Sequence, residues 1–339
     1  MDLKKRIEDK SLNKKIDKKC PFPTKNLLIE ITNYCNNKCI FCYNHCMKRE
    51  KKFIDKKLCE RILNEAYELG MREVGFYVTG EPLLDKRLSN FISLAKSIGY
   101  DYIYITTNGI LANLNKVKKL YKSGLNSIKY SINATNDMDY RKIHQTDNFN
   151  TVIRNLKDVY NWKKENKMDI KIYVSFVYTN MTYNEKEIDN LFKNICDEYI
   201  TMPAINQGGL IPKIKNISST KSSNINKFSL PCSYPFNSVI VTVEGYLTAC
   251  CMDFENFLAY ADLNKYSLYD CWNNETIVSF RKKHLKKEVS GTICENCIYN
   301  STNIPKPLEK KLFKLEKVDN KIFCNHIDEI LRRDIEWKQ

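Results

Sequence analysis

Three cysteines near the beginning of the chain have the spacing of a metal-binding loop. The segment T-N-Y-C-N-N-K-C-I-F-C-Y-N places Cys35, Cys39 and Cys42 in a C-x3-C-x2-C arrangement, with Phe41 before the last thiol. Such a loop can ligate three irons of a cubane [4Fe–4S] cluster and leave the fourth iron open to chemistry. The same thiols could instead bind zinc together with Cys46, or be buried without a metal. The spacing favours the iron–sulfur interpretation over these two.

A second group of cysteines lies in the last third of the chain. Cys232, Gly245 and Cys250 form a C-x12-G-x4-C arrangement across a predicted hairpin, and Cys294 and Cys297 follow as C-x2-C. Four cysteines can saturate an iron–sulfur cluster or a zinc ion, and their spacing does not choose between the two. The thiols without a consistent ligand spacing are interpreted as structural or incidental: Cys20, Cys46, Cys59, Cys196, Cys271 and Cys324.

The segments between these cysteines alternate between strand-like and helical patterns. Apolar stripes at helical spacing separate the strand-like runs, as in the helix predicted between Asp55 and Gly70. This alternation predicts a parallel sheet with right-handed crossovers. The six predicted strands cover residues 27–31, 74–78, 102–106, 127–132, 170–177 and 199–202.

Polar residues follow several of these predicted strands. The cysteine loop follows the first strand, the turn at Gly80 the second, the turn at Asn108 the third, and Asn133 the fourth. Because functional groups collect at the carboxyl ends of parallel strands, we expect these residues to lie close together. A zinc knuckle would not require this coincidence, which therefore supports the iron–sulfur interpretation.

The C-x3-C-x2-C loop with its aromatic residue resembles the signature of the radical S-adenosylmethionine (radical SAM) superfamily. The resemblance implies an α/β fold, a partial (β/α)6 TIM-type barrel, in which the methionine part of the cofactor chelates the open iron. It also implies reductive cleavage of S-adenosyl-L-methionine to a 5′-deoxyadenosyl radical. A reductant such as flavodoxin or ferredoxin would supply the electron.

The same resemblance implies which residues hold the cofactor. The turn G-E-P at residues 80–82 is a variant of the family's G-G-E stretch, which holds the methionine amino group. Ser131 and Asn133 would meet the ribose and the carboxylate, and Met202 would lie near the adenine. Each also has a structural interpretation, such as a turn-capping asparagine or a core methionine. The full set implied to bind the cofactor is Phe41, Gly80, Glu81, Pro82, Asn108, Ser131, Asn133 and Met202.

The segment from Cys232 to Cys297 resembles the SPASM/twitch extension of radical SAM enzymes, in which such cysteines hold an auxiliary [4Fe–4S] cluster. The further cysteines of a full SPASM pattern are absent after the C-x2-C pair, which favours one auxiliary cluster over two. The run C-C-M-D-F at residues 250–254, with Trp272 and Arg281, is most similar to twitch-type aminocyclitol dehydrogenases. The resemblance covers about residues 27–298.

An auxiliary cluster implies a route for oxidation. The deoxyadenosyl radical would remove a hydrogen atom from a hydroxyl-bearing carbon, and loss of a proton with electron transfer to the cluster would give a carbonyl. Asp253 is a candidate for holding the substrate hydroxyl, with a surface aspartate as an equal alternative. Cys251 could be a buried small hydrophobe, an alternative ligand or a hydrogen-atom donor, and the last role would make the enzyme an epimerase.

Three hypotheses about function remain open. The first is a radical SAM oxidoreductase that acts on an alcohol of a sugar-like or aminocyclitol small molecule. The second is a peptide-modifying maturase that forms thioether or carbon–carbon crosslinks or epimers; it is less favoured because no N-terminal leader-recognition domain is visible. The third, from a different class, is a structural zinc or nucleic-acid-binding protein.

Composition and charge favour an intracellular enzyme. The net charge of +15 is scattered over lysines of every predicted helix without an RNA-binding motif, so a nucleic-acid partner is not favoured. The chain shows no helix-length apolar run and no signal peptide, which predicts a cytoplasmic protein without a membrane partner. In a reducing compartment, its 14 cysteines favour metal ligation over disulfides.

The expected organisation has five parts. A hairpin at 238–243 and 246–249 and a helix at 268–285 would form the auxiliary-cluster region. The parts are a polar N-terminal extension at 1–23, the partial barrel at 24–206, a linker at 207–229, a twitch-like domain at 230–300 and a helical C-terminal tail at 301–339.

Overall fold

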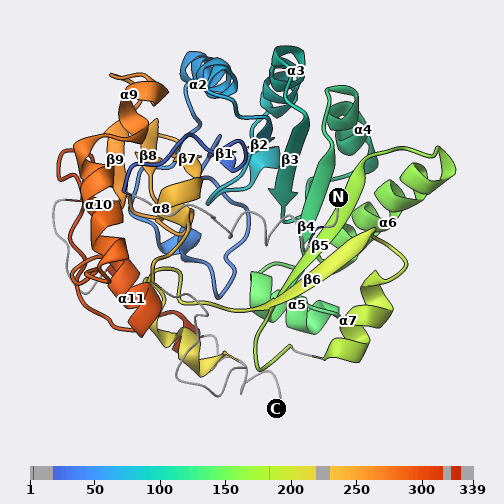
Figure 1. Ribbon diagram of the computed structural model, residues 1–339. Helices are drawn as coiled ribbons and strands as arrows, with labels where there is room; N and C mark the ends of the chain where they lie inside the picture. The colour runs from blue at the N-terminus through green and yellow to red at the C-terminus, as the bar shows by residue number, and fades with distance from the viewer. Residues whose placement is uncertain (1–2, 4–17, 183, 219–229, 316–321, 330–339) are drawn as a thin grey trace.

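A computed structural model describes the chain at residues 3, 18–182, 184–218, 230–315 and 322–329. A nine-stranded sheet runs through it in the order β6-β5-β4-β3-β2-β1-β7-β8-β9 (Figure 1). The strands from β1 to β6 are parallel to their neighbours, which confirms the predicted α/β fold with a partial barrel. They are β1 (Leu27–Ile29), β2 (Glu73–Gly75), β3 (Tyr102–Thr107), β4 (Ser127–Ser131), β5 (Lys171–Tyr178) and β6 (Glu198–Pro203).

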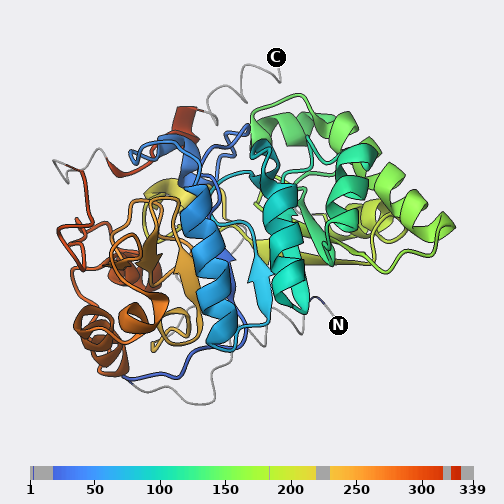
Figure 2. The same cartoon turned by 90° about the horizontal axis from the view of Figure 1, so that it is seen from above.

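Helices that follow these strands cover the outer face of the curved sheet, and Figure 2 shows α2 and α3 side by side there. The side chain of Asp55 caps α2 by accepting a hydrogen bond from Leu58 N at 2.8 Å. Leu58, Ile62 and Ala66 then bury one face at helical spacing. The helices are α2 (Lys56–Glu68), α3 (Leu88–Ile98), α4 (Leu114–Lys122), α5 (Asp137–His144), α6 (Phe149–Glu165) and α7 (Glu185–Phe192).

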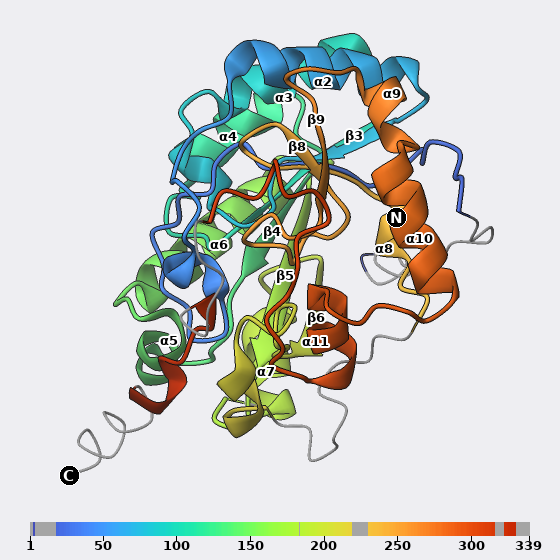
Figure 3. The same cartoon turned by 90° about the vertical axis from the view of Figure 1, so that its left-hand side faces the viewer.

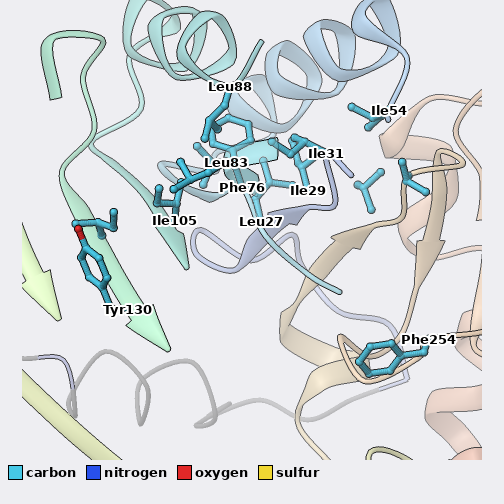
Figure 4. Packing of buried hydrophobic residues seen from close by; sticks show 14 of the residues in the cluster. Leu27, Ile29, Ile31, Ile54, Phe76, Leu83, Leu88, Ile105, Tyr130 and Phe254 are labelled. Atoms are coloured by element: carbon cyan, nitrogen blue, oxygen red, sulfur yellow. The ribbon is translucent and has the colours of Figure 1, made fainter. Parts of the chain in front are cut away.

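The two faces of the sheet have different surroundings, because successive side chains of a strand point to opposite sides. Leu27 and Ile29 pack into the large core between the sheet and the helices, together with Phe76 (Figure 4). Leu28, between them, belongs to a separate cluster on the other face, which we call the inner-face cluster. It consists of Leu28, Tyr104 and Ile240, with Tyr77, Val78, Tyr102, Tyr234 and Cys251 packed against it.

The region after the predicted linker extends the same sheet. β7 (Val239–Val241) pairs parallel with β1, and β8 (Tyr246–Thr248) and β9 (Ala259–Asp262) continue as antiparallel neighbours. The hairpin therefore lies directly beside the strand that leads into the cysteine loop. Figure 3 shows this region with its helices α8 (Tyr234–Asn237), α9 (Leu268–Trp272), α10 (Glu275–Leu285) and α11 (Ile293–Tyr299).

Some elements differ from those expected. The single helix expected at 268–285 is two helices, because Asn274 caps a new one by accepting from Ile277 N at 3.0 Å. Elements that were not expected at all include α5, α8, β9 and α11. The tail expected to be helical at 301–339 is irregular at 301–315 and helical at 327–329.

The predicted linker and N-terminal extension are described in part. The linker contains a 3-10 helix, η3 (Pro212–Asn216), while residues 219–229 lie outside the described residues, as do 1–2 and 4–17 of the extension. Within the described part of the chain, no helix combines the length and apolar character that crossing a membrane requires.

Candidate active site

The cysteine loop begins just beyond β1. Cys42 N donates to Cys39 O at 2.9 Å, which closes a tight turn. Burial raises the pKa of the Cys35 thiol to about 12, with a further contribution from Cys42, and burial followed by the charges of Cys42 and Cys35 raises that of Cys39. Charges on neighbouring thiols raise these pKa values because the cysteines lie close together. A nearby cation is therefore needed for all three to ionise to thiolates. The irons of a [4Fe–4S] cluster supply that charge, so the three residues fit such a group.

The G-E-P turn lies directly on the cysteine loop. Glu81 N donates to Tyr34 O at 2.8 Å. A Cβ atom at Gly80 would lie 2.3 Å from Thr32 O and 2.7 Å from Tyr34 O, a distance that no side chain tolerates. Asn44 Nδ2 also bridges the two segments, with bonds of 2.9 Å to Asn33 O and 2.8 Å to the carbonyl at residue 79. Glycine is therefore required here by the close approach of two backbones.

We expect Gly80→Ala to disrupt the cysteine loop. The added Cβ must push the loop away from the turn, so the variant should lose about four irons per chain and its affinity for S-adenosyl-L-methionine. Iron analysis and equilibrium dialysis measure both quantities. Gly70→Ala is the control: its φ of 95° is strained for alanine but no atom lies within 4 Å, so stability should fall while the iron content stays unchanged. Full iron in Gly80→Ala would contradict the steric argument.

The Glu81 carboxylate is already satisfied by protein donors. It accepts bonds from Leu83 N at 3.0 Å, Thr107 Oγ1 at 2.8 Å and Asn108 N at 2.7 Å. Burial raises the pKa of Glu81 to about 7. Its side chain thus fastens the turn to the end of β3, and Pro82 begins the following 3-10 helix, η2 (Pro82–Leu84).

The remaining residues implied to bind the cofactor lie at several distances from the cysteine loop. Asn108 contacts the loop, with Nδ2 at 4.0 Å from Cys35 Sγ and 2.7 Å from Asn36 Oδ1. Phe41 is buried in the large core. Ser131 Oγ lies 3.4 Å from the hydroxyl of residue 175, and Met202 is half-buried on β6. Their roles toward the cofactor stay predictions.

His144, at the end of α5, contacts the loop and was missed by sequence reasoning. Its Nδ1 lies 3.3 Å from Cys39 Sγ, and its Nε2 lies 3.3 Å from Asn133 Nδ2. The main chain of α5 also accepts bonds from Lys38 N and Ile40 N. Burial lowers the pKa of His144 to about 3, so the ring is neutral at pH 7 and can donate one hydrogen bond and accept another. The short polar segment around His144 gave no helical signal.

A buried ion network next to the loop was also missed. Arg49 Nη2 bonds Glu30 at 2.9 Å, and Arg49 Nη1 bonds Glu244 at 2.9 Å and Asn256 Oδ1 at 2.8 Å. Glu30 follows β1 directly and also accepts from the Thr79 hydroxyl. The side chains of Arg49 and Glu30 are only 5% and 0% exposed. The signal in the sequence was a glutamate inside the apolar run 27–31.

The second cysteine group converges on one apolar pocket. Cys232 precedes α8 (Tyr234–Asn237), Cys250 follows β8, and Cys294 and Cys297 lie three residues apart on one face of α11. Burial raises the pKa of Cys294, and the charges of Cys232 and Cys297 raise it further. Four buried thiols that oppose one another's ionisation fit a multiply charged metal group. The donor set alone suits either a [4Fe–4S] cluster or zinc.

The two tentative catalytic residues have different surroundings. The Asp253 carboxylate accepts bonds from Thr248 Oγ1 at 2.7 Å, Phe257 N at 2.8 Å and Leu258 N at 2.8 Å. These bonds hold the turn between β8 and β9, and Asp253 is only 3% exposed, so it is not a surface residue. Its role in holding a substrate hydroxyl stays a prediction. Cys251 packs against the inner-face cluster, beside the second cysteine group.

The interpretation of the remaining thiols needs one correction. Cys46 and Cys324 are bonded to each other by a disulfide across 278 positions, so they are not incidental. The others are buried thiols, as expected: Cys20, Cys59, Cys196 and Cys271.

Comparison with known families matches both halves of the chain. Residues 29–195 match the Radical SAM superfamily, and residues 232–298 match SPASM, an iron–sulfur cluster-binding domain. The first match contains the cysteine loop and the G-E-P turn. The second begins at Cys232 and ends one residue after Cys297.

Individual proteins of several activities are similar to this chain. An S-adenosyl-L-methionine-dependent 2-deoxy-scyllo-inosamine dehydrogenase from Niallia circulans is 23% identical over 79% of this chain and 90% of its own length. A probable GTP 3′,8-cyclase from Saccharolobus solfataricus is 27% identical over 51% of this chain and 52% of its own.

Among solved structures, BtrN in complex with AdoMet and 2-DOIA superposes with a TM-score of 0.55 at 19% identity, covering 90% of this chain and 98% of that one. SuiB from Streptococcus suis bound to precursor peptide SuiA superposes with a TM-score of 0.60 at 16% identity, covering 81% of this chain and 68% of that one. Likeness at this level of identity shows a shared fold.

Proposed function

Because the chain belongs to the radical SAM superfamily and carries a SPASM iron–sulfur domain, we propose that it oxidises an alcohol carbon of a sugar-like or aminocyclitol substrate. Its cofactors are S-adenosyl-L-methionine, a [4Fe–4S] cluster in the radical SAM domain and auxiliary iron–sulfur binding in the SPASM domain. A structural zinc or nucleic-acid-binding protein is not retained as an alternative.

Two cysteine groups would hold the two clusters. Cys35, Cys39 and Cys42 would ligate the cluster that binds the cofactor, and the pocket cysteines one auxiliary cluster. When bound, the first cluster with S-adenosyl-L-methionine would supply a 5′-deoxyadenosyl radical, and the auxiliary cluster would supply an electron acceptor. A one-electron reductant such as flavodoxin or ferredoxin would start each turnover. The auxiliary ligands would be Cys232, Cys250, Cys294 and Cys297.

The inner-face cluster supplies groups that suit a polyhydroxylated ring. The Tyr77 and Tyr104 rings lie 5.9 Å apart, and Lys129 Nζ lies 5.9 Å from the Tyr77 ring centre. Aromatic faces can pack against the C–H face of such a ring, while phenol and ammonium groups can bond hydroxyls. Tyr234 and Cys251 extend the cluster to the second cysteine group, since Tyr234 also lines the pocket.

The observation that carries the proposal is the position of the inner-face cluster, with Lys129 beside it. One end of it follows β3 toward Asn108, which lies beside Cys35, and its other end meets the pocket cysteines. A substrate held there would face a hydrogen-atom acceptor and an electron acceptor together. The similarity to the Niallia circulans dehydrogenase over 90% of that protein's length supports oxidation of an aminocyclitol. The similarity to SuiB bound to its precursor peptide, at 16% identity, supports a shared fold and gives no argument for a peptide substrate.

The proposal is tested with a deuterated substrate. 2-Deoxy-scyllo-inosamine with deuterium on its alcohol carbons should transfer one deuterium to 5′-deoxyadenosine, and mass spectrometry should detect a ketone in equal amount. A panel of aminocyclitols, sugar alcohols and short peptides then defines the class. Deuterium transfer from a peptide Cα–D alone would overturn the proposal in favour of peptide modification.

We expect Cys294→Ala to separate radical formation from oxidation. Loss of one auxiliary ligand should lower the iron content from about eight to about four per chain, while reductive cleavage of the cofactor continues without ketone formation. Iron and sulfide analysis and chromatography of both products measure this. Cys271→Ala, at a buried thiol of α9, should change neither. An unchanged iron count in Cys294→Ala would contradict the assignment of the pocket.

A further inference from the structure

Four potential metal ligands from distant parts of the chain meet next to the cysteine loop. His45 and Cys46 end the 3-10 helix η1 (Tyr43–Cys46), directly after Cys42, while Cys324 and His326 come from the C-terminal segment. One donor atom from each lies within 4.8 Å of all the others. Figures 2 and 3 both draw the red C-terminal segment beside the blue segment that contains η1.

The packing around these residues holds the two segments together. Cys324 Sγ lies 2.8 Å from His326 Nδ1 and 3.9 Å from His45 Nε2, and the two imidazole rings stand at 90° with centres 4.5 Å apart. Cys324 N donates to Leu210 O at 2.7 Å, and the Tyr43 hydroxyl donates to the carbonyl of residue 322. The donors are therefore brought together by main-chain contacts as well as by their own side chains.

We propose that His45, Cys46, Cys324 and His326 bind one zinc ion that joins the C-terminal segment to the cysteine loop. Two thiolates and two imidazoles form a donor set of structural tetrahedral zinc sites. Zn–S bonds of about 2.3 Å and Zn–N bonds of about 2.0 Å place tetrahedral ligands roughly 3.3–3.8 Å apart. The donor pairs that lie up to 4.8 Å apart must approach by about 1 Å, while the two sulfurs, which are bonded to each other in the disulfide, must separate to roughly 3.8 Å.

The geometry favours one ion over a two-iron cluster. A [2Fe–2S] cluster with this donor set carries both histidines on one iron and both cysteines on the other, which separates the nitrogen pair from the sulfur pair. Here the nitrogens are not separated from the sulfurs, because all four donor atoms lie within 4.8 Å of one another and His326 Nδ1 is only 2.8 Å from Cys324 Sγ. Mixed contacts of this kind belong to a single centre.

The disulfide and the zinc site are alternative states of the same two sulfurs. A dithiol reductant transfers two electrons and two protons to the Cys46–Cys324 bond, which breaks to give two thiols, while the reductant becomes a disulfide. Zinc then displaces the two thiol protons to solvent, and the neutral imidazoles complete its coordination. Either state ties the same two segments together.

The test measures metal content rather than activity, so it is independent of the substrate. Full-length protein is reconstituted anaerobically with iron and sulfide, reduced with dithiothreitol, desalted, incubated with zinc sulfate and desalted again. We expect about one zinc per chain beside about eight irons. Cys324→Ser should lose at least nine-tenths of the zinc and keep its iron, and Cys59→Ala should keep both metals.

His326→Gln is the second variant, measured in the same way in case Cys324→Ser does not fold. If His326→Gln loses its zinc and keeps its iron, the result supports the proposed zinc site. Three results overturn it: zinc retained by both ligand variants, a Cys46–Cys324 disulfide still detected by peptide mapping after reduction and zinc loading, or iron in place of zinc at a stoichiometry that the ligand variants lower.

Discussion

Replacing Cys39 with alanine is expected to abolish formation of 5′-deoxyadenosine while the chain stays folded. The thiol lies in the turn closed by Cys42 N and touches His144 Nδ1 at 3.3 Å, and with only two protein ligands left the cluster cannot hold its open iron in place. We expect a loss of cofactor cleavage of at least about 100-fold, since second-sphere changes alone cost about 10–100-fold. Anaerobic assays with dithionite and chromatography of the nucleoside measure it.

The control for this variant is Cys59→Ala, which removes a fully buried thiol of α2 that lies outside both cysteine groups. It should keep full cleavage and about eight irons, whereas Cys39→Ala should keep about four, all in the auxiliary pocket. Circular dichroism should overlay for both variants and the parent. Cleavage by Cys39→Ala at more than a tenth of the parent's rate would rule out this loop as the cofactor-cleaving site.

The repeating part of the fold was readable in the sequence because its signals are local. Apolar residues at period 3.6 predicted α2, and the apolar run 27–31 predicted the buried strand β1. The polar segment of α5 buries only Tyr140, Ile143 and His144, which is too short a stripe to recognise. Yet its His144 supports the cysteine loop, so an element invisible to periodicity shapes the candidate site.

The spacing of the two cysteine groups could be predicted, but the direction of individual side chains could not. A glycine–glutamate turn does not reveal that the Glu81 carboxylate bonds Thr107 and Asn108 within the protein. Likewise, two thiols 278 positions apart carry no mutual signal until the chain has folded. Such contacts depend on tertiary structure, which a single sequence does not display.

Arg49→Met is expected to cost about 3–5 kcal/mol of stability, because it leaves the buried carboxylates of Glu30 and Glu244 without their cation. Arg49 is held at its backbone too, where its N–H donates to Glu255 Oε2 at 3.1 Å. Its guanidinium thus joins the cysteine-loop segment, the end of β1 and the turn after β7. Urea denaturation followed by circular dichroism, on anaerobic reconstituted protein, should show a lower midpoint.

A matched control is Lys56→Met, whose partner Glu60 lies one turn along α2 with both side chains more than a third exposed, and its cost should stay below about 1 kcal/mol. In the double variant Arg49→Met with Glu30→Gln, one unpaired charge has been removed, so the loss should be smaller than the sum of the two single losses. Additive losses would mean that the pair is not coupled. Coupling would show instead that the end of β1 and the segment after the cysteine loop are joined by a buried charge pair that stabilises both.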